Sequence, residues 1–105
     1  MTVNIVRYKT HPDRADENQA FVEKVFAELH AEQPDGLRYT SYRLEDGVSF
    51  VHVAAVDTDD GANPLTQTVA FGEFLADIGA RCEEPPAASG ATVVGSYRAG
   101  GGAER

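Results

Sequence analysis

The sequence predicts one α+β domain whose elements follow the order βαββαβ. Its most informative segment is residues 47–56, GVSFVHVAAV, which is typical of a strand that is apolar on both faces. Side chains alternate across a strand, so Phe50 and His52 share one face while Val51 and Val53 share the other. A chain of 105 residues can cover one face of a small sheet with its own helices. The other apolar face is therefore expected to meet a ligand or another subunit.

The first half of the chain predicts a strand followed by a helix. Residues 2–9 (TVNIVRYK) form a short run rich in β-branched residues, and a Pro-Asp turn signal follows them. Apolar residues then recur at helical spacing, namely Phe21, Val22, Val25, Phe26 and Leu29. Asp13 or Asp16 is expected to cap this helix, because both precede its apolar stripe. The helix is expected to stop near Gln33, since Pro34 cannot continue it.

A β-hairpin is predicted in the middle of the chain. Residues 37–44 (LRYTSYRL) alternate, which places Tyr39 and Ser41 on one side of a strand. The Asp46-Gly47 pair that follows favours a tight turn, because these residues tolerate positive φ. The strand of residues 37–44 and the strand of residues 47–56 should therefore be antiparallel neighbours.

The second half of the chain predicts another helix and a last strand. Asn63-Pro64 favours a helix start, since Asn caps free amides and Pro lacks one. The apolar stripe expected on this helix comprises Phe71, Phe74, Leu75, Ile78 and Cys82. Pro85-Pro86 is expected to end any helix, and residues 90–98 (GATVVGSYR) are predicted to form the final strand. Residues 99–105 are expected to be a flexible Gly-rich tail beyond a single domain of residues 1–98.

This order of elements predicts the ferredoxin-like plait. Right-handed crossovers place both helices on one face of a four-stranded antiparallel sheet whose strands lie in the order four, one, three, two. Strand three is then central, which explains its apolar sequence. The helix-free face carries Val51, Val53 and Ala55, and a second copy presenting the same face is the simplest cover for it. We therefore expect a homodimer through this face.

Composition narrows the functional classes. A net charge of -8, from 17 acidic and 9 basic residues, disfavours nucleic acid and anionic membranes as partners. No targeting segment or long apolar span is evident, so a soluble, cytoplasmic protein is expected. The single cysteine, Cys82, excludes an internal disulfide and is expected on a helix face. No His or Cys spacing indicates a metal site, and the acidic loop of residues 57–61 lacks the later ligands of a calcium loop.

Several segments resemble the antibiotic-biosynthesis-monooxygenase-like (ABM) domains of the dimeric α/β-barrel superfamily. They are the PDGLRY segment of residues 34–39, the FVHV segment of residues 50–53, and the helix of residues 64–74 after a short acidic loop. The resemblance implies homodimers whose sheets pack face to face, with a small-molecule cavity between each sheet and its helices. It also implies, for some members, oxidation of polyketide phenols without metal or flavin, and for others haem degradation.

The chain departs from that family's pattern in three places. Residues 54–56 are Ala-Ala-Val where the family commonly has a Glu and an aromatic residue, and residues 66–68 are Thr-Gln-Thr where a His often opens the second helix. The chain has no Trp, so the Asn-Trp-His set of the haem-degrading branch cannot form, although Asn4 lies in the first strand. The sequence therefore disfavours haem chemistry, and no cofactor is expected.

His52 is the predicted catalytic residue. It lies between apolar neighbours, where desolvation would keep the imidazole neutral and able to accept a proton from a phenolic substrate. Asn4, Tyr39, Phe50 and Phe71 are the predicted substrate-binding residues, since they supply aromatic walls and polar tips for a flat ligand. The alternative for His52 is a core histidine bonded to a backbone or tyrosine partner.

Two functions remain open from the sequence. The first is a cofactor-independent monooxygenase-like enzyme for a small aromatic or polyketide-type molecule, with His52 as base. The second is a non-catalytic dimeric ligand-binding or interaction domain. A third option, a protein similar to muconolactone isomerase or to a dismutase of the same superfold, is selected by no residue of the chain.

Overall fold

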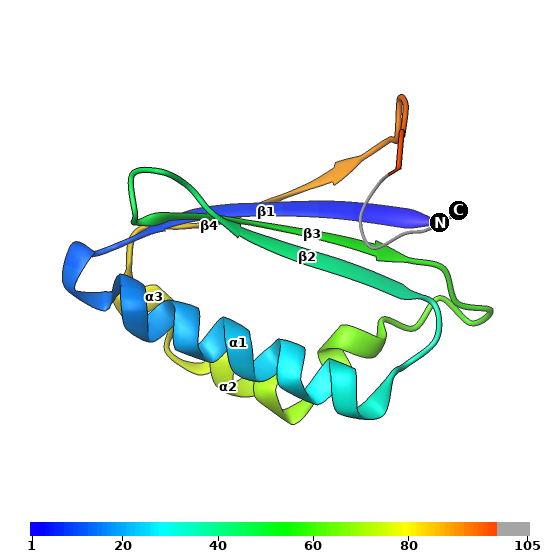
Figure 1. The fold of residues 1–105 in the computed structure, drawn as a ribbon, viewed down its shortest axis with the longest axis horizontal. Coiled ribbons are helices and arrows are strands. Elements are labelled where there is room, and N and C mark those ends of the chain that lie inside the picture. Colours follow the sequence, from blue (N-terminus) through cyan, green and yellow to red (C-terminus); the bar gives the residue numbers. More distant parts are fainter. Residues whose placement is uncertain (99–105) are drawn as a thin grey trace.

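The computed structural model describes residues 1–98 and contains one four-stranded sheet with helices on a single face (Figure 1). The elements in chain order are β1 (Thr2–Thr10), a 3-10 turn (Pro12–Arg14), α1 (Ala15–Glu32), β2 (Leu37–Arg43), β3 (Ser49–Val56), a second 3-10 turn (Pro64–Gln67), α2 (Val69–Ala76), α3 (Ile78–Arg81) and β4 (Cys82–Ala91). The predicted tail of residues 99–105 lies outside the described residues.

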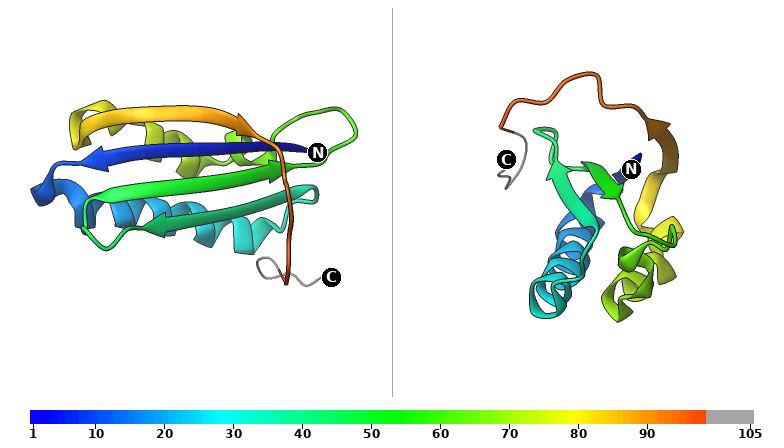
Figure 2. Two further views of the ribbon diagram at one scale, coloured as in Figure 1. Left: turned by 90° about the horizontal axis from the view of Figure 1, so that it is seen from above. Right: turned by 90° about the vertical axis from the view of Figure 1, so that its right-hand side faces the viewer.

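The sheet has the order β2-β3-β1-β4, and neighbouring strands are antiparallel. Seen from above, the four strands lie side by side with the helices behind them (Figure 2). This is the predicted ferredoxin-like topology, which is confirmed with its strand order. None of the helices in residues 1–98 is long and apolar enough to cross a membrane.

The core lies between the sheet and the helices. Alternation along β1 and β3 points Tyr8, Phe50 and His52 to the helix side, where all three are buried. From below, α1 contributes Val22 and Val25, and α2 contributes Phe74. This layer fixes the sheet face on which the polar residues described below are brought together.

The predicted hairpin between β2 and β3 is confirmed. Gly47 adopts a positive φ of 78°, and the Asp46 carboxylate accepts hydrogen bonds from the amides of Val48 and Ser49 and from the Ser49 hydroxyl. These bonds hold the pKa of Asp46 down to about 2, the Ser49 hydroxyl being the main cause. The resulting register places Ser41 directly opposite His52.

The start of α1 differs from the prediction, because neither Asp13 nor Asp16 caps it. The chain enters through the 3-10 turn that begins at Pro12, and Arg14 stands at the cap position without a side-chain cap bond. Asp16 therefore lies inside the first helical turn, where it accepts a hydrogen bond of 3.0 Å from Arg43 of β2. The predicted end of α1 is confirmed by Gln33, which closes the helix with a left-handed φ of 47°.

The second helical region is shorter than predicted. Asn63 caps only the 3-10 turn of Pro64–Gln67, while Thr68, whose backbone is extended, caps α2 and accepts a bond from the Phe71 amide. Asp77 separates α2 from α3. Cys82 is not on a helix face as predicted, because the chain has already left α3; it is the first residue of β4 and is buried.

The last strand is the main correction to the predicted fold. It spans Cys82–Ala91 rather than residues 90–98 and includes Pro85-Pro86. Proline is tolerated there because β4 is an edge strand, and its register against β1 shifts between the pairs Lys9–Glu84 and Arg7–Ala87. Residues 92–98 have no strand to pair with, since β1 begins at Thr2.

A glycine substitution tests the connection between α1 and β2. Gly36 has a φ of 81°, and a Cβ added there would stand 2.6 Å from the carbonyl oxygen of Asp57 and 2.7 Å from Cγ2 of Thr58. Gly36→Ala should therefore lower the free energy of unfolding by about 2 kcal/mol or more, from backbone strain and overpacking together. Urea unfolding followed by circular dichroism measures the loss.

The matched control is Gly47→Ala, at a φ of 78° with no atom within 4 Å of the added Cβ. It carries the backbone strain without the steric clash, so its loss should be only about 1 kcal/mol. Equal losses for the two variants would contradict the close packing of Gly36 against Asp57.

Candidate functional site

His52, in the middle of β3, is the centre of a buried hydrogen-bond network. Only 4% of its surface is exposed. Its Nε2 lies 2.7 Å from the Tyr8 hydroxyl of β1, and its Nδ1 lies 2.5 Å from the Ser41 hydroxyl and 2.9 Å from the Tyr39 hydroxyl of β2. The rings of Tyr8 and Tyr39 also stack near the imidazole, at interplanar angles of 13° and 10°. Three adjacent strands thus converge on one histidine.

Burial keeps these groups neutral. Desolvation lowers the pKa of His52 from its ordinary value of 6.5 to about 4. Desolvation likewise raises the pKa of Tyr8, although the hydrogen bond from Asn18 acts to lower it. Desolvation also raises the pKa of Tyr39, although a hydrogen bond from Ser41 acts to lower it. At neutral pH the network therefore consists of an uncharged imidazole and uncharged phenols.

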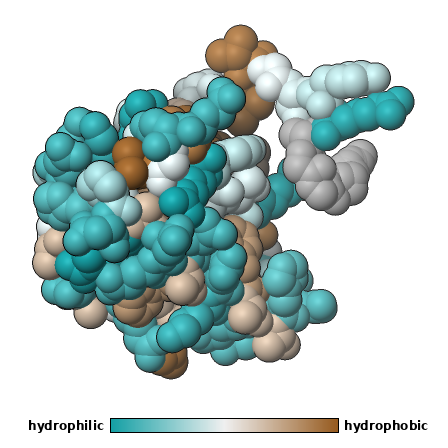
Figure 3. Space-filling view, turned by 60° about the vertical axis from the view of Figure 1, so that its left-hand side comes forward, coloured by the Kyte–Doolittle hydropathy of each residue, from teal (hydrophilic) through white to brown (hydrophobic). Residues whose placement is uncertain are grey.

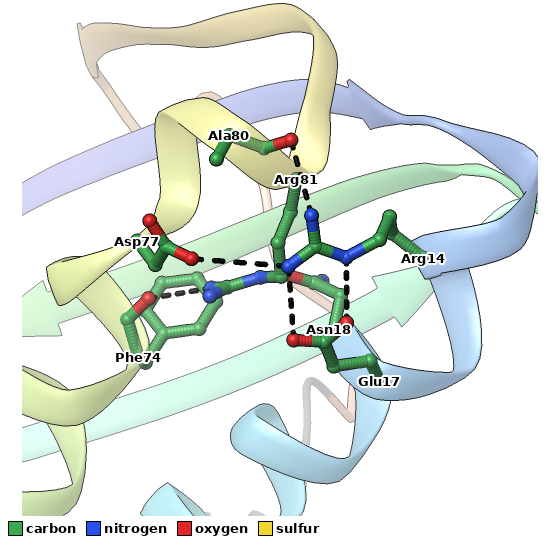
Figure 4. Close-up of polar contacts among 7 residues, drawn as sticks. All are labelled: Arg14, Glu17, Asn18, Phe74, Asp77, Ala80 and Arg81. Atoms are coloured by element: carbon green, nitrogen blue, oxygen red, sulfur yellow. Dashed lines mark hydrogen bonds and ion pairs between the residues drawn. The ribbon is translucent and has the colours of Figure 1, made fainter.

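The network continues into the helices through Asn18 and Arg81 (Figure 4). The Asn18 side-chain amide of α1 donates to the Tyr8 hydroxyl at 2.8 Å, and its Oδ1 accepts from Nε of Arg81 at 3.1 Å. Arg81 also donates from Nη2 to the carbonyl of Phe74. Asn18 and Arg81 are fully buried, and among the residues that the structure describes Nη1 of Arg81 has no hydrogen-bond partner.

An apolar cavity of about 160 Å³ lies beside this network, between the sheet and α2. Its polar tips come from Asn4, Tyr39, His52 and Asn63. The remaining lining residues are apolar, namely Val6, Ala54, Leu65, Phe71, Phe74, Leu75, Ile78 and Pro86. A mostly dry pocket with a few convergent polar groups is the usual form of a small-molecule site.

The structure brings most of the predicted site residues together. His52, Asn4, Tyr39 and Phe71 all line the cavity. Phe50 is not among the lining residues; it lies on the same face of β3, buried and stacked on Tyr8 at 5.5 Å between ring centroids. The roles predicted for these five residues stay predictions.

Other site residues were missed at the sequence level. Ser41 had a signal, because it shares a strand face with Tyr39 and lies opposite His52 once the hairpin register is known. Asn18 and Arg81 had none, since a polar residue on an amphipathic helix is ordinarily solvated. Asn63 was assigned only a capping role.

The hydrogen bonds restrict what His52 can do. A neutral imidazole has one acceptor nitrogen and one donor nitrogen, and protein hydroxyls occupy both here. A ligand in the cavity would therefore meet this end of the network at the Tyr39 hydroxyl rather than at a free nitrogen of His52. Over residues 1–98, no group of three His, Cys, Asp or Glu side chains is placed to hold a metal ion.

No protein-family model matches the sequence, and no curated protein matches it either. Solved structures match the fold. Rv0793 from Mycobacterium tuberculosis has a TM-score of 0.72 at 20% identity, with 90% of this chain and 96% of that chain covered. A structure described as an antibiotic biosynthesis monooxygenase has a TM-score of 0.72 at 16% identity, with 90% and 100% covered. A variant of SnoaB, a cofactor-independent oxygenase from Streptomyces nogalater, has a TM-score of 0.65 at 19% identity, with 90% and 94% covered.

These matches define the class of fold. The chain has the ferredoxin-like α+β fold of ABM structures over about nine-tenths of its length, so the resemblance drawn from the sequence is confirmed at the level of fold. Identities of 20% or less carry the architecture and not the activity.

The lowered pKa of His52 predicts a pH-dependent stability. Below pH 6.5 the unfolded chain binds a proton at this residue, while His52 in the folded chain stays unprotonated down to about pH 4. The contribution of His52 is thus fully present above pH 6.5, and about 2 to 3 kcal/mol of it should be lost as the pH falls to 4. Chemical denaturation at pH 7 and pH 4 measures the loss.

The control is His52→Gln, which keeps hydrogen-bonding groups and does not titrate. Other groups titrate equally in both proteins, so the difference between the two pH dependences isolates His52. Identical pH dependences for the two proteins would show that the imidazole charges freely in the folded state.

Proposed function

We propose that this chain is a cofactor-independent monooxygenase-like protein that binds a small aromatic molecule with an ionisable oxygen in the cavity beside His52. The observation that carries the proposal is a buried, neutral histidine joined to a cavity-lining tyrosine at the polar end of an apolar pocket. In this proposal Tyr39 contacts the ligand oxygen, His52 holds Tyr39, and Phe71 and Phe74 flank the ring.

The cavity volume limits the size of the ligand. A cavity of about 150 Å³ is known to hold one benzene ring, and this cavity measures about 160 Å³. A single substituted ring therefore fits this cavity, whereas a fused polyketide would require α2 and the Pro64–Gln67 turn to move outward. We propose a one-ring substrate.

The low pKa of His52 favours a ligand that is itself acidic. A simple phenol has a pKa near 10, and the imidazole of His52 has a pKa of about 4. Proton transfer from such a phenol to His52 is therefore uphill by roughly 8 kcal/mol. His52 is thus a weak base for such a phenol unless the resulting ion pair offsets that energy. An acidic phenol or enol, largely ionised at neutral pH, avoids the cost.

The proposed reaction needs dioxygen as its only co-reactant. The bound phenolate gives one electron to dioxygen, and the phenoxyl radical and superoxide combine at the ring carbon para to the oxygen. The O–O bond of the peroxide then breaks as the ring C–H proton is lost, so that one phenolate and one dioxygen yield one quinone and one hydroxide. The protein supplies a dry cavity and hydrogen bonds that orient the anion.

A non-catalytic ligand-binding domain is the second candidate, and one observation favours it. Protein hydroxyls already satisfy both nitrogens of His52, as in a structural core histidine. The cavity would then bind the same aromatic ligands without oxidising them.

An oxygen-uptake experiment separates the two candidates. With 2,4,6-trihydroxyacetophenone, an electron-rich acidic ring with a free para position, the protein should consume one dioxygen per ring and produce quinone absorbance. His52→Gln should lower the rate by roughly 100-fold, because Tyr39, the proposed partner of the ligand oxygen, is then no longer held in place. An oxygen electrode measures the dioxygen consumed, and an absorbance spectrometer measures the quinone formed.

The matched control is Tyr42→Phe, since Tyr42 lies on the same strand as Tyr39 but is exposed on the opposite face. Its rate should equal that of the parent protein, whereas Tyr39→Phe should be strongly impaired. Ligand binding without oxygen uptake would establish the second candidate, and absence of binding would overturn both.

We also propose that two copies of the chain pair through the helix-free face of the sheet. Ile5 and Tyr42 are exposed there; the half-buried Val53 lies opposite Ile5, and the half-buried Val51 lies opposite Tyr42. Beyond β4, residues 92–98 rise from this side of the sheet and carry apolar surface, with Val94 fully exposed (Figure 3). Exposed apolar surface on both the face and the projecting segment supports a protein partner.

Light scattering tests the dimer. The parent chain should have twice the monomer mass at micromolar concentration. Val53→Glu should reduce that mass to the monomer value, because the symmetric interface would bury two facing carboxylates. Ala27→Glu adds the same charge on the exposed side of α1 and should leave the dimer intact. A monomeric parent chain would overturn the pairing.

A further inference from the structure

We propose that Arg81, acting through Asn18 and Tyr8, fixes the single imidazole proton of His52 on Nδ1, so that the cavity presents the Tyr39 hydroxyl as a hydrogen-bond donor. Arg81 is thus a positioning residue for the site. The ligand class that follows is an aromatic compound with a carbonyl, phenolate or enolate oxygen pointed at Tyr39, and this last step rests on the proposed function.

The first step is the orientation of the Asn18 side chain. A guanidinium has donors only, so the atom of Asn18 that lies 3.1 Å from Nε of Arg81 must be its carbonyl oxygen. The amide nitrogen is then the atom 2.8 Å from the Tyr8 hydroxyl. Chemistry alone decides the assignment, because the flipped amide would bring two donors together.

The second step is the direction of the Tyr8 hydroxyl. Its oxygen accepts from Asn18, and the acceptor available for its own proton is Nε2 of His52 at 2.7 Å. If Nε2 carried the proton instead, the hydroxyl proton of Tyr8 would be left without an acceptor in a residue only 2% exposed. An unsatisfied buried donor disfavours that tautomer by a factor of roughly ten to a hundred.

The third step places the proton of His52. The imidazole is neutral and its Nε2 is an acceptor, so Nδ1 is the donor, and it faces the hydroxyls of Ser41 and Tyr39. The hydroxyl proton of Tyr39 is then not needed by the imidazole. Tyr39 lines the cavity, so this proton is free to bind an acceptor on a ligand.

The charge of Arg81 adds a preference for an anion. The guanidinium is completely buried, and in the described part of the chain it forms no ion pair. It lies against the rings of Phe21 and Phe74, at 4.6 and 5.5 Å from their centroids. Phe74 is a wall of the cavity, so a buried cation without an ion pair stands one side chain behind that wall, and the Glu17 carboxylate lies within range of its charge.

Nitrogen NMR of the full chain tests the proton position directly. Two-bond correlations from the ring protons of 15N-labelled protein at pH 7 distinguish the protonated nitrogen of His52 from the bare one, and His11 and His30 serve as internal references. The expected result is a protonated Nδ1 and a bare Nε2. A proton on Nε2, or on both nitrogens, would overturn the inference without any need for a variant or a ligand.

Asn18→Asp reverses the direction of the chain of hydrogen bonds. The carboxylate still accepts from Arg81, but it must also accept from Tyr8, so the Tyr8 oxygen becomes an acceptor for Nε2–H. The proton of His52 should move to Nε2 in at least nine molecules of ten. Gln67→Glu makes the same amide-to-carboxylate change on an exposed turn and should leave the proton on Nδ1. An unmoved proton in folded Asn18→Asp would exclude Arg81 and Asn18 from this role.

A pair of matched ligands tests the consequence for recognition. Acetophenone and α-methylstyrene have nearly the same shape, but only the former carries an acceptor oxygen. The ratio of their association constants should fall by roughly threefold to tenfold from the parent chain to Asn18→Asp, because Tyr39 then donates to the bare Nδ1. An unchanged ratio would overturn the ligand class. Binding of neither compound would overturn the ligand class, whereas the proposed function is decided by the oxygen-uptake experiment and the proton position by its own spectrum.

Discussion

The burial of His52 is the constraint on which the interior of this protein depends. An imidazole enclosed at the centre of a sheet must have both nitrogens bonded, because an unsatisfied buried polar atom is expensive. The two strands beside β3 and helix α1 meet that requirement, through Tyr8, Tyr39, Ser41 and, behind Tyr8, Asn18. The same bonds tie the sheet to the helix layer. The adjacent space can therefore remain apolar, since the polar groups satisfy one another.

The fold followed from the sequence wherever local pattern and packing agreed. The two apolar faces around His52 identified a central strand, and the Asp46-Gly47 turn identified its neighbour. The pattern failed at β4, because Pro85-Pro86 was interpreted as a break although an edge strand tolerates it. Residues 92–98 have the composition of a strand but no partner strand within residues 1–98, so composition alone could not identify the strand that pairs with β1.

The candidate site was only partly accessible from the sequence. Alternation placed Tyr39 and His52 on the cavity face, because a strand fixes the side of every residue. Ser41 required the hairpin register, which depends on the length of the loop rather than on its turn signal. Arg81 and Asn18 stand 63 positions apart, and their contact depends on how α1 and α3 are rotated over the sheet. No local pattern encodes that rotation, and an arginine near a helix end ordinarily indicates a solvated side chain.

The fold accounts for the presence of a cavity but not for its chemistry. A sheet covered by α1 and the short helices α2 and α3 leaves a cavity between the sheet and α2, and structures of low identity share the fold. That chemistry depends on the set of groups at the polar end of the cavity. The hydrogen bonds in that set form a series in which each group donates to the next. The series begins at the Arg81 guanidinium, which can only donate, and ends at the Tyr39 hydroxyl, which keeps a proton to donate. Hydrogen bonds in series polarise one another, so a charge buried behind Phe74 acts on a ligand that it does not touch. Selectivity at such a site is a property of the whole chain of bonds, and a change at any link alters what the cavity accepts.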